Sequence, residues 1–215
     1  MTAPSKTTAV VIGAGPGIGA AIARQLTAQG RRIVLIARTA GRLEILAATL
    51  RASVPVTIMQ ADASNAGGIA DVIDAIRHDG PIGVVAYNAA YPGGRLSTAG
   101  LPVLRASLEV NVLSALAAVQ AALPDLEATN GSVLFTGGGL ALHPNPEAGV
   151  LSLGKAALRS AALILAAELA PRGIKVRTLT VAGAIAPGTA FDPDRIAGRL
   201  ISLIDEDTAE AIYNG

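Results

Sequence analysis

The sequence predicts a doubly wound α/β fold, in which a parallel sheet carries helices on both faces, within a single domain over residues 1–215. Three observations predict it. Short β-branched segments alternate with longer segments rich in Ala and Leu. The short segments are apolar at nearly every position, as strands buried on both faces are. No linker, repeat or low-complexity stretch interrupts the alternation, and 215 residues are enough for one sizeable core.

Six strands and six helices are expected in alternation. The strands are expected at Thr8–Ile12, Arg32–Ile36, Val56–Gln60, Gly83–Tyr87, Ser132–Thr136 and Lys175–Thr180. The helices are expected at Gly17–Gln29, Gly41–Arg51, Ala66–His78, Leu101–Leu123, Ala148–Pro171 and Pro193–Glu206. This order is βαβαβ twice, which predicts the three-layer αβα arrangement of a Rossmann fold. Residues 208–215 are too polar and too few for a seventh strand, so none is expected.

The first predicted strand is followed directly by a glycine-rich turn and then by a helix. Glycine lets the backbone approach a nucleotide pyrophosphate, and the helix N-terminus offers free N–H groups and a positive dipole end. Gly13, Gly17 and Gly19 have the spacing G-x-x-x-G-x-G, since Ile18 stands where G-x-G-x-x-G needs glycine. With Gly15 they predict a dinucleotide site, against the alternative of an ordinary glycine-rich βα turn.

The second predicted strand is followed by Ala37-Arg38-Thr39, with no acidic residue at its end. NAD-specific sites of this fold place an acidic residue there to bind the ribose 2′-hydroxyl. A guanidinium can instead bind the 2′-phosphate of NADP through two hydrogen bonds. We therefore expect NADP rather than NAD, with Arg38 as the binding residue and Arg42 as a weaker candidate. The plainer alternative for Arg38 is a solvated loop arginine.

Four further motifs follow in chain order: Asp62-Ala63, Asn88-Ala89-Ala90, Asn111 and Lys155-Ala156-Ala157-Leu158. Together with the glycine spacing, they resemble the short-chain dehydrogenase/reductase family over nearly the whole chain. The resemblance implies an oxidoreductase in which Asp62 contacts the adenine, and in which Ala90 replaces the glycine of the family's Asn-Ala-Gly turn. It implies these cofactor-binding residues: Gly13, Gly15, Gly17, Ile18, Gly19, Arg38, Asp62, Ala63, Asn88, Ala89 and Lys155.

The same resemblance reveals two departures at the catalytic centre. In the family, a tyrosine four residues before the lysine protonates the substrate oxygen, and a serine about thirteen residues earlier binds that oxygen. Alignment on Lys155 places Leu151 at the tyrosine position and Gly138 at the serine position. Lys155, which in the family also binds the nicotinamide ribose, and Asn111, which holds a relay water there, are kept. Leucine has no proton to donate, so the family's usual carbonyl reduction is not expected.

Three side chains are candidates for the missing proton donor. His143 lies in the loop after the fifth strand, and histidine titrates near neutral pH. Tyr91 follows the Asn88 turn on the nicotinamide side of the cleft, where a phenol could donate. Ser152 neighbours Leu151, but adjacent helical residues point about 100° apart. The plainer alternatives are a surface histidine for His143 and a tyrosine packed on the rim for Tyr91.

The function expected from these residues is hydride transfer to or from a small organic substrate by an NADP-dependent oxidoreductase with a non-standard active site. An iminium or a polarised C=C bond fits, because neither needs a protonated oxygen at the attacked centre. The alternative, from another class, is a non-catalytic NADP-binding protein, either a sensor or the inactive partner of a heteromeric enzyme. The sequence names neither the substrate nor the direction of the reaction.

Composition and charge exclude several other classes of function. The formal net charge is +1 and no Lys/Arg-rich run occurs, so we expect no nucleic-acid partner. Cysteine is absent, which excludes disulfides and a thiol nucleophile, and no metal site is expected. Residues 1–6 contain no apolar signal core, and the apolar helical runs Leu113–Leu123 and Ala161–Ala167 are shorter than the ~20 residues of a membrane span. We therefore expect a cytoplasmic protein without a membrane partner.

Two expectations concern the substrate side and the assembly. Family members usually carry a helical substrate lid after the sixth strand, but here Phe191 follows Ala182-Gly183 closely, so the lid is short or absent. The helices that contain Asn111 and Lys155 are apolar around more of their circumference than one sheet-facing stripe buries. The family pairs these helices across a two-fold axis, so we expect a homodimer. The missing seventh strand argues against the family's tetramer.

Overall fold

The computed structural model describes residues 7–215, and the expectation about a signal core in Met1–Lys6 lies outside the described residues. Seven parallel strands form one sheet in the order β3-β2-β1-β4-β5-β6-β7. They are β1 (Thr8–Ile12), β2 (Arg32–Ala37), β3 (Val56–Gln60), β4 (Ile82–Tyr87), β5 (Ser132–Thr136), β6 (Lys175–Val181) and β7 (Glu210–Tyr213). The order reverses between β1 and β4, so the predicted doubly wound α/β fold is confirmed.

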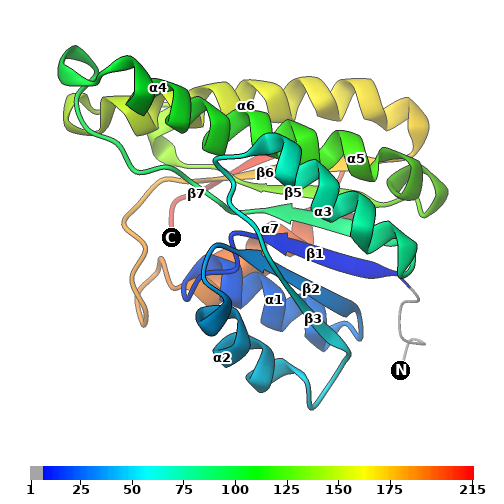
Figure 1. Cartoon of the computed structure of the whole chain (residues 1–215). Coiled ribbons are helices and arrows are strands. Elements are labelled where there is room, and N and C mark those ends of the chain that lie inside the picture. The colour runs from blue at the N-terminus through cyan, green and yellow to red at the C-terminus, as the bar shows by residue number, and fades with distance from the viewer. Residues whose placement is uncertain (1–6) are drawn as a thin grey trace.

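Helices form a layer on each face of the sheet (Figure 1). One layer contains α1 (Ile18–Ala28), α2 (Ala40–Leu50) and α7 (Pro193–Ser202). The other contains α3 (Ala66–His78), α5 (Ser114–Ala128) and α6 (Gly149–Leu169), with α4 (Leu101–Leu108) beside α6. The three-layer αβα arrangement is therefore also confirmed.

Residues of each strand alternate between the two layers, as in any strand. In β1, Ala9 and Val11 pack into the core on the side of α1, α2 and α7, whereas Val10 and Ile12 pack on the side of α3, α5 and α6. All four side chains are at most 1% exposed. Burial on both faces is the reason why these strands read as continuous apolar runs.

The seventh strand corrects the expectation that residues 208–215 form none. Glu210 to Tyr213 pair in parallel with Thr178 to Val181 of β6. The acidic residue that argued against a strand has two partners: Glu210 accepts hydrogen bonds from Arg159 Nε at 2.6 Å and from Thr180 Oγ1 at 2.8 Å. A partly buried carboxylate with such partners is compatible with the sheet, because the bonds offset its desolvation.

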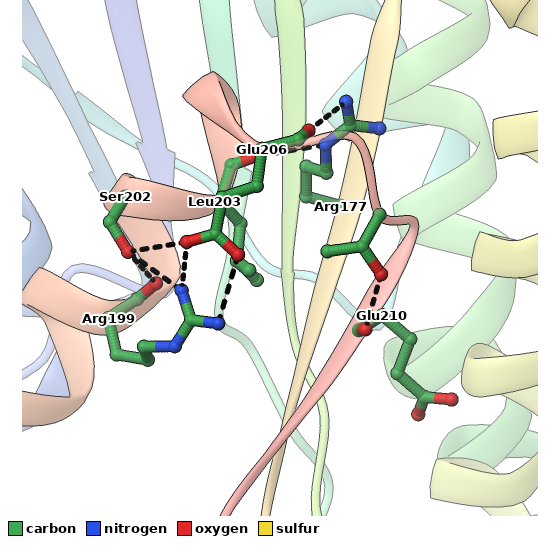
Figure 2. Close-up of polar contacts among 7 residues, drawn as sticks. Arg177, Arg199, Ser202, Leu203, Glu206 and Glu210 are labelled. Atoms are coloured by element: carbon green, nitrogen blue, oxygen red, sulfur yellow. Dashed lines mark hydrogen bonds and ion pairs between the residues drawn. The ribbon is translucent and has the colours of Figure 1, made fainter.

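Arginine side chains hold the chain that leads into β7 (Figure 2). Arg177 of β6 donates hydrogen bonds to the carbonyl oxygens of Leu203 and Glu206, at 2.9 and 2.8 Å. Arg199 of α7 donates to the Glu206 carboxylate at 3.0 Å and to Ser202 Oγ at 2.9 Å. Polar side chains of β6 and α7 therefore anchor the segment that joins α7 to β7.

The loop between β6 and α7 contains no helix, as the short-lid expectation states. It is tied to β7, because the Tyr213 hydroxyl donates to the Ala190 carbonyl oxygen at 2.7 Å and the Tyr213 ring meets Phe191 edge-on, with centroids 5.7 Å apart. A Cβ on Gly183 would lie 2.2 Å from the Phe191 ring. Glycine at this position lets the ring pack against the end of β6.

Two expectations about the long helices need correction. The helix expected at Leu101–Leu123 contains a π-helical turn, Glu109–Leu113, and continues to Ala128. Among residues 7–215, the helical segments Leu101–Thr129 and Pro146–Arg172 are long and apolar enough to cross a membrane by length and composition. The expectation that the apolar runs are too short was therefore wrong. Core helices of soluble proteins pass the same test, and α5 and α6 both pack on the sheet here.

Candidate functional site

A cavity of about 450 Å³ lies at the carboxyl ends of β1 to β4, where the strand order reverses. Ligands of open α/β sheets bind at this point. Eight of the residues expected at the site line it: Gly13, Gly15, Arg38, Asp62, Ala63, Asn88, Ala89 and Tyr91. Six others do not: Gly17, Ile18, Gly19, Asn111, His143 and Lys155.

The four glycines of the first turn form two pairs. Gly13 has a φ of +82°, and a Cβ there would lie 2.5 Å from the Ala89 backbone nitrogen. A Cβ on Gly19 would lie 2.2 Å from the Gly13 carbonyl oxygen. By contrast, a Cβ on Gly15 or Gly17 would meet no atom within 4 Å. Gly13 and Gly19 therefore serve close packing, whereas Gly15 and Gly17 leave open space for a ligand.

The N-terminus of α1 borders that open space. No side chain in the described part of the chain caps this helix. The Ala20 N–H donates to the Gly15 carbonyl oxygen at 2.9 Å, whereas the N–H groups of Ile18 and Gly19 have no partner among the described residues and are available to an anionic ligand. The Asn88 side chain supports the turn, because its Nδ2 donates to the Gly13 carbonyl oxygen at 3.0 Å. The glycine turn and the N-terminus of α1 therefore leave room for an anionic ligand.

The loop after β3 forms another wall of the cavity. The Ser64 backbone N–H donates to Asp62 Oδ1 at 2.9 Å, and the Ser114 hydroxyl donates to the Ala63 carbonyl oxygen at 2.6 Å. The second carboxylate oxygen of Asp62 has no hydrogen-bond partner within residues 7–215. These bonds fix the loop and leave one Asp62 oxygen for a ligand.

Arg38 and Arg42 line the cavity from the loop after β2 and from the first turn of α2. Both side chains are exposed, and neither guanidinium has a hydrogen-bond or ion-pair partner among the described residues. Asp62 is the one acidic residue in the described cavity lining. Two unpaired guanidinium groups at one end of a cavity are suited to a phosphate group.

Asn111 is fully buried in the π-helical turn between α4 and α5. Its Oδ1 accepts from the Tyr91 backbone N–H at 3.1 Å, and its Nδ2 donates to Ser107 Oγ at 3.0 Å. A Cβ on Gly154 would lie 2.5 Å from Asn111 Nδ2, so this glycine lets α6 approach the amide. The Asn111 amide positions the Tyr91 backbone at the cavity wall and does not itself line the cavity.

Lys155 of α6 is 9% exposed, and its Nζ donates to the Thr136 carbonyl oxygen at 2.8 Å. Burial lowers the pKa of Lys155 from 10.5 to about 8. Gly138 has an extended φ of −157°. A Cβ on Gly138 would lie 3.7 Å from three carbons of the Lys155 side chain. The position aligned with the family serine therefore faces the lysine.

The structure separates the three candidate proton donors. Tyr91 lines the cavity, and its hydroxyl has no hydrogen-bond partner in the part of the chain that the structure describes. His143 is exposed and lies outside the cavity lining. Ser152 is engaged, because its Oγ donates to the Ala148 carbonyl oxygen at 2.9 Å and accepts from the Asn145 N–H at 3.2 Å.

Sequence reasoning missed two residues that support the site. Ser107 precedes Asn111 by four residues, a spacing that places both side chains on one helix face, so this partner could have been found. Gly154 lies inside a predicted helix, where glycine is unfavourable and signals a close packing contact. The π-helical turn itself has no sequence signal in this chain.

Comparisons with known proteins agree with this geometry. The family described as short chain dehydrogenase matches residues 7–191. An uncharacterised oxidoreductase of Staphylococcus epidermidis is 31% identical over 175 residues, which cover 80% of this chain and 75% of that protein. An alcohol dehydrogenase of the archaeon Thermococcus sibiricus, solved with 5-hydroxy-NADP, is 27% identical with a TM-score of 0.86, over 96% of this chain and 95% of that one. A metagenomic short-chain oxidoreductase solved with NADP is 26% identical with a TM-score of 0.85, over 97% of this chain and 96% of that one.

Proposed function

This chain belongs to the short-chain dehydrogenase family and is an oxidoreductase of that type, and we propose that it uses NADP without the family's tyrosine as proton donor. The observation that carries the proposal is the contrast between the cofactor cavity and the positions aligned with the family's catalytic residues. The cofactor cavity has its glycine turn and two unpaired guanidinium groups, whereas Leu151 and Gly138 occupy the positions aligned with the tyrosine and serine.

The residues present fit a nicotinamide dinucleotide phosphate. The open space at Gly15 and Gly17, with the N-terminus of α1, would hold the pyrophosphate. Arg38 and Arg42 would hold the 2′-phosphate, and the free oxygen of Asp62 would contact the adenine. When bound, this cofactor supplies or accepts a hydride. Two structural neighbours were solved with NADP or 5-hydroxy-NADP, which supports the choice of NADP.

The substrate would be a small organic molecule that binds between the cofactor and the Lys155 region. Leu151 and Gly138 offer no hydroxyl group to a carbonyl oxygen. An imine or an activated C=C bond therefore fits this site better than a simple ketone. The second candidate function is a non-catalytic NADP-binding protein, either a sensor or an inactive partner subunit. Leu151 and Gly138 favour this candidate too, because neither has a hydroxyl group.

Binding and turnover measurements test the proposal. We expect NADPH to bind more tightly than NADH in a fluorescence titration. We expect NADPH oxidation with some members of a panel of imines and enones, and little with simple ketones. Tight NADPH binding without turnover of any substrate would support the non-catalytic candidate. Equal affinity for NADPH and NADH would contradict the assignment of Arg38.

We also propose a homodimer that pairs the helices α4 to α6. Their surface exposes six large apolar side chains by 37 to 65%: Leu101, Val103, Leu108, Leu113, Leu153 and Ile164. Burial of such side chains against a second copy would remove this apolar surface from water. Because the structure contains β7, a missing seventh strand is no longer a reason to exclude an assembly larger than a dimer. Light scattering at micromolar concentration is expected to give the dimer mass, and a monomer mass would contradict the proposal.

A further inference from the structure

The glycines at positions 137–139 leave space at one place only. A Cβ on Gly137 would lie 3.0 Å from the Leu179 carbonyl oxygen, and one on Gly139 would lie 3.0 Å from Ala182 Cα. A Cβ on Gly138 would have ordinary van der Waals distances, all to the side chain of Lys155. The space that a side chain would fill at Gly138 therefore borders Lys155.

The hydrogen-bonding capacity of Lys155 is largely unused. An ammonium has three N–H groups, and one of them donates to the Thr136 carbonyl oxygen at 2.8 Å. Nζ has no second acceptor among residues 7–215. The Thr136 hydroxyl is also buried without a hydrogen-bond partner in the described structure. An enclosed ammonium with unused donors is unfavourable, and a substrate oxygen or nitrogen would relieve this.

No carboxylate in the described part of the chain compensates the charge of Lys155. Ionisable side chains on α6 and on the elements packed against it are bonded elsewhere or exposed: Arg105 of α4, Glu109 of the π-helical turn, Glu147 before α6, Arg159 and Glu168 of α6, Arg172 after α6, and Lys175 and Arg177 of β6. Burial is therefore the cause of the lowered pKa of Lys155. A general acid is most effective when its pKa lies near the working pH.

We propose that Lys155 is a catalytic residue of this oxidoreductase and that its ammonium donates a proton to the substrate heteroatom. This role rests on the proposed function. In the reduction of a neutral C=N bond, the carbon gains the hydride that NADPH supplies. The heteroatom gains a proton as one N–H bond of Lys155 breaks. NADP⁺ and the reduced substrate leave, and the neutral amine takes a proton from water.

The first test is the pH dependence of turnover with the substrates that the panel identifies. The acid must be protonated, so kcat of the unmodified protein is expected to fall as the pH rises through about 8. Lys155→Met and Lys155→Arg, measured at saturating NADPH, should lower kcat by about 10²-fold and abolish this alkaline decrease, because neither side chain titrates there. The matched control is Lys175→Arg, at an exposed lysine, which should leave rate and profile unchanged.

The second test needs no turnover. The chain has three lysines, Lys6, Lys155 and Lys175, so lysine-selective isotope labelling gives three side-chain signals by NMR. The signal that disappears in Lys155→Arg belongs to Lys155, and in the cofactor-free protein it is expected to titrate near pH 8. Titration at the ordinary value of about 10.4 would overturn the proposal.

The outcomes separate this role from the proposed function. Turnover that keeps its rate and its alkaline decrease in Lys155→Met would overturn the lysine role alone. An alkaline decrease that disappears in Tyr91→Phe but persists in Lys155→Arg would do the same and assign the acid to Tyr91. A protein that binds NADPH but turns over no substrate would overturn the proposed function, and with it this role.

Discussion

The carboxyl edge of the sheet has two halves that are equipped differently. Around β1 and β2, the site consists of backbone turns and unpaired charge, with open space at Gly15 and Gly17 and two free guanidinium groups. Around β5 and α6, it has Gly138 beside one enclosed lysine, Lys155. The first half has the geometry to bind a dinucleotide. In the proposed function, the second half is a catalytic centre without the family's tyrosine and serine.

Cofactor binding and catalysis therefore depend on different features of this fold. Gly13 and Gly19 of the glycine turn cannot gain a Cβ without a clash, because a Cβ at either position would lie against backbone atoms. Gly138 lies against the flexible part of one lysine side chain, in an extended conformation that any residue adopts. Residues of the catalytic half can therefore change while the fold and the cofactor cavity remain.

The largest effect is expected from Gly13→Ala. The new Cβ would lie 2.5 Å from the Ala89 nitrogen, at a φ of +82°. Overpacking and a left-handed alanine together should lower the free energy of unfolding by about 3 kcal/mol or more. Thermal and urea denaturation measure this loss, and NADPH binding should be lost as well.

The matched variant Gly17→Ala separates the two pairs of glycines. Its Cβ meets no atom within 4 Å, so the stability should stay close to that of the unmodified protein. NADPH binding should nevertheless weaken, because the methyl group would occupy the space proposed for the pyrophosphate. Equal loss of stability in both variants would show that the distinction between packing and ligand-facing glycines is wrong.

The double variant Leu151→Tyr with Gly138→Ser tests the catalytic half. It restores the two groups that act on one oxygen, so the reduction of simple ketones with NADPH should rise by about 10²-fold. The serine fits, since the Cβ contacts at Gly138 are 3.7 Å and its φ is extended. Each single variant should give less. Strong ketone reduction by the unmodified protein would mean that the catalytic centre has been misassigned.

Arg38→Ala should weaken NADPH binding by about 10-fold, since a hydrogen bond to a charged group contributes about 1.5–3 kcal/mol. NADH binding should change little, because NADH has no 2′-phosphate. Arg42→Ala serves as the comparison variant. It should weaken NADPH binding less than Arg38→Ala does, because Arg42 lies one turn further along the chain, within α2. Fluorescence titration of both cofactors measures these affinities. An equal effect of Arg38→Ala on both cofactors would remove the arginine from the 2′-phosphate site.

The smallest effect concerns Glu210 at the start of β7. The hydrogen bonds from Arg159 lower the pKa of Glu210 in the folded protein. A lowered folded-state pKa stabilises above the unfolded value of about 4.3, and this contribution disappears as the pH falls through the folded-state pKa. Glu210→Gln should therefore lower stability by about 1 kcal/mol at pH 7 and by less in acid.

The control for Glu210 is the exposed ion pair between Arg95 and Glu147. Glu147→Gln should change the free energy of unfolding by less than about 0.5 kcal/mol, because solvent screens such pairs. Urea denaturation at several pH values measures both variants. A loss of stability in Glu210→Gln that does not shrink in acid would mean that the carboxylate charge is not its cause.

Most of the fold could be predicted from the sequence because β1, β2, β4, β5 and β6 are largely buried on both faces. Their apolar runs have one structural interpretation, and each predicted strand lies within two residues of the observed one. β7 could not be predicted in the same way. It lies at the edge of the sheet and depends on Arg159 and Thr180, which are distant in sequence from Glu210. Pairing of that kind leaves no periodic pattern in a four-residue segment.

The residues of the cofactor half of the site could also be predicted from the sequence better than those of the catalytic half. Glycine spacing and the residue after β2 report local backbone and charge, and the cavity lining includes Gly13, Gly15 and Arg38. The catalytic half depends on contacts between elements. The engagement of Ser152 with Asn145, and of Asn111 with Tyr91, follows from how α6 and the π-helical turn meet the neighbouring loops. Residue types alone do not determine such contacts.

The wide turn at Glu109–Leu113 makes the site sensitive to the number of residues in one helix. A π-helical turn holds one residue more than an α-helix would in its place, and each α-helical residue rotates the chain by about 100°. Deleting a single codon here would let the helix close as a regular α-helical turn, so the side chains within the turn, Asn111 among them, would change direction. The amide that holds the Tyr91 backbone would then leave its position. Evolution by substitution can alter this site gradually, whereas a one-residue deletion would dismantle it in one step.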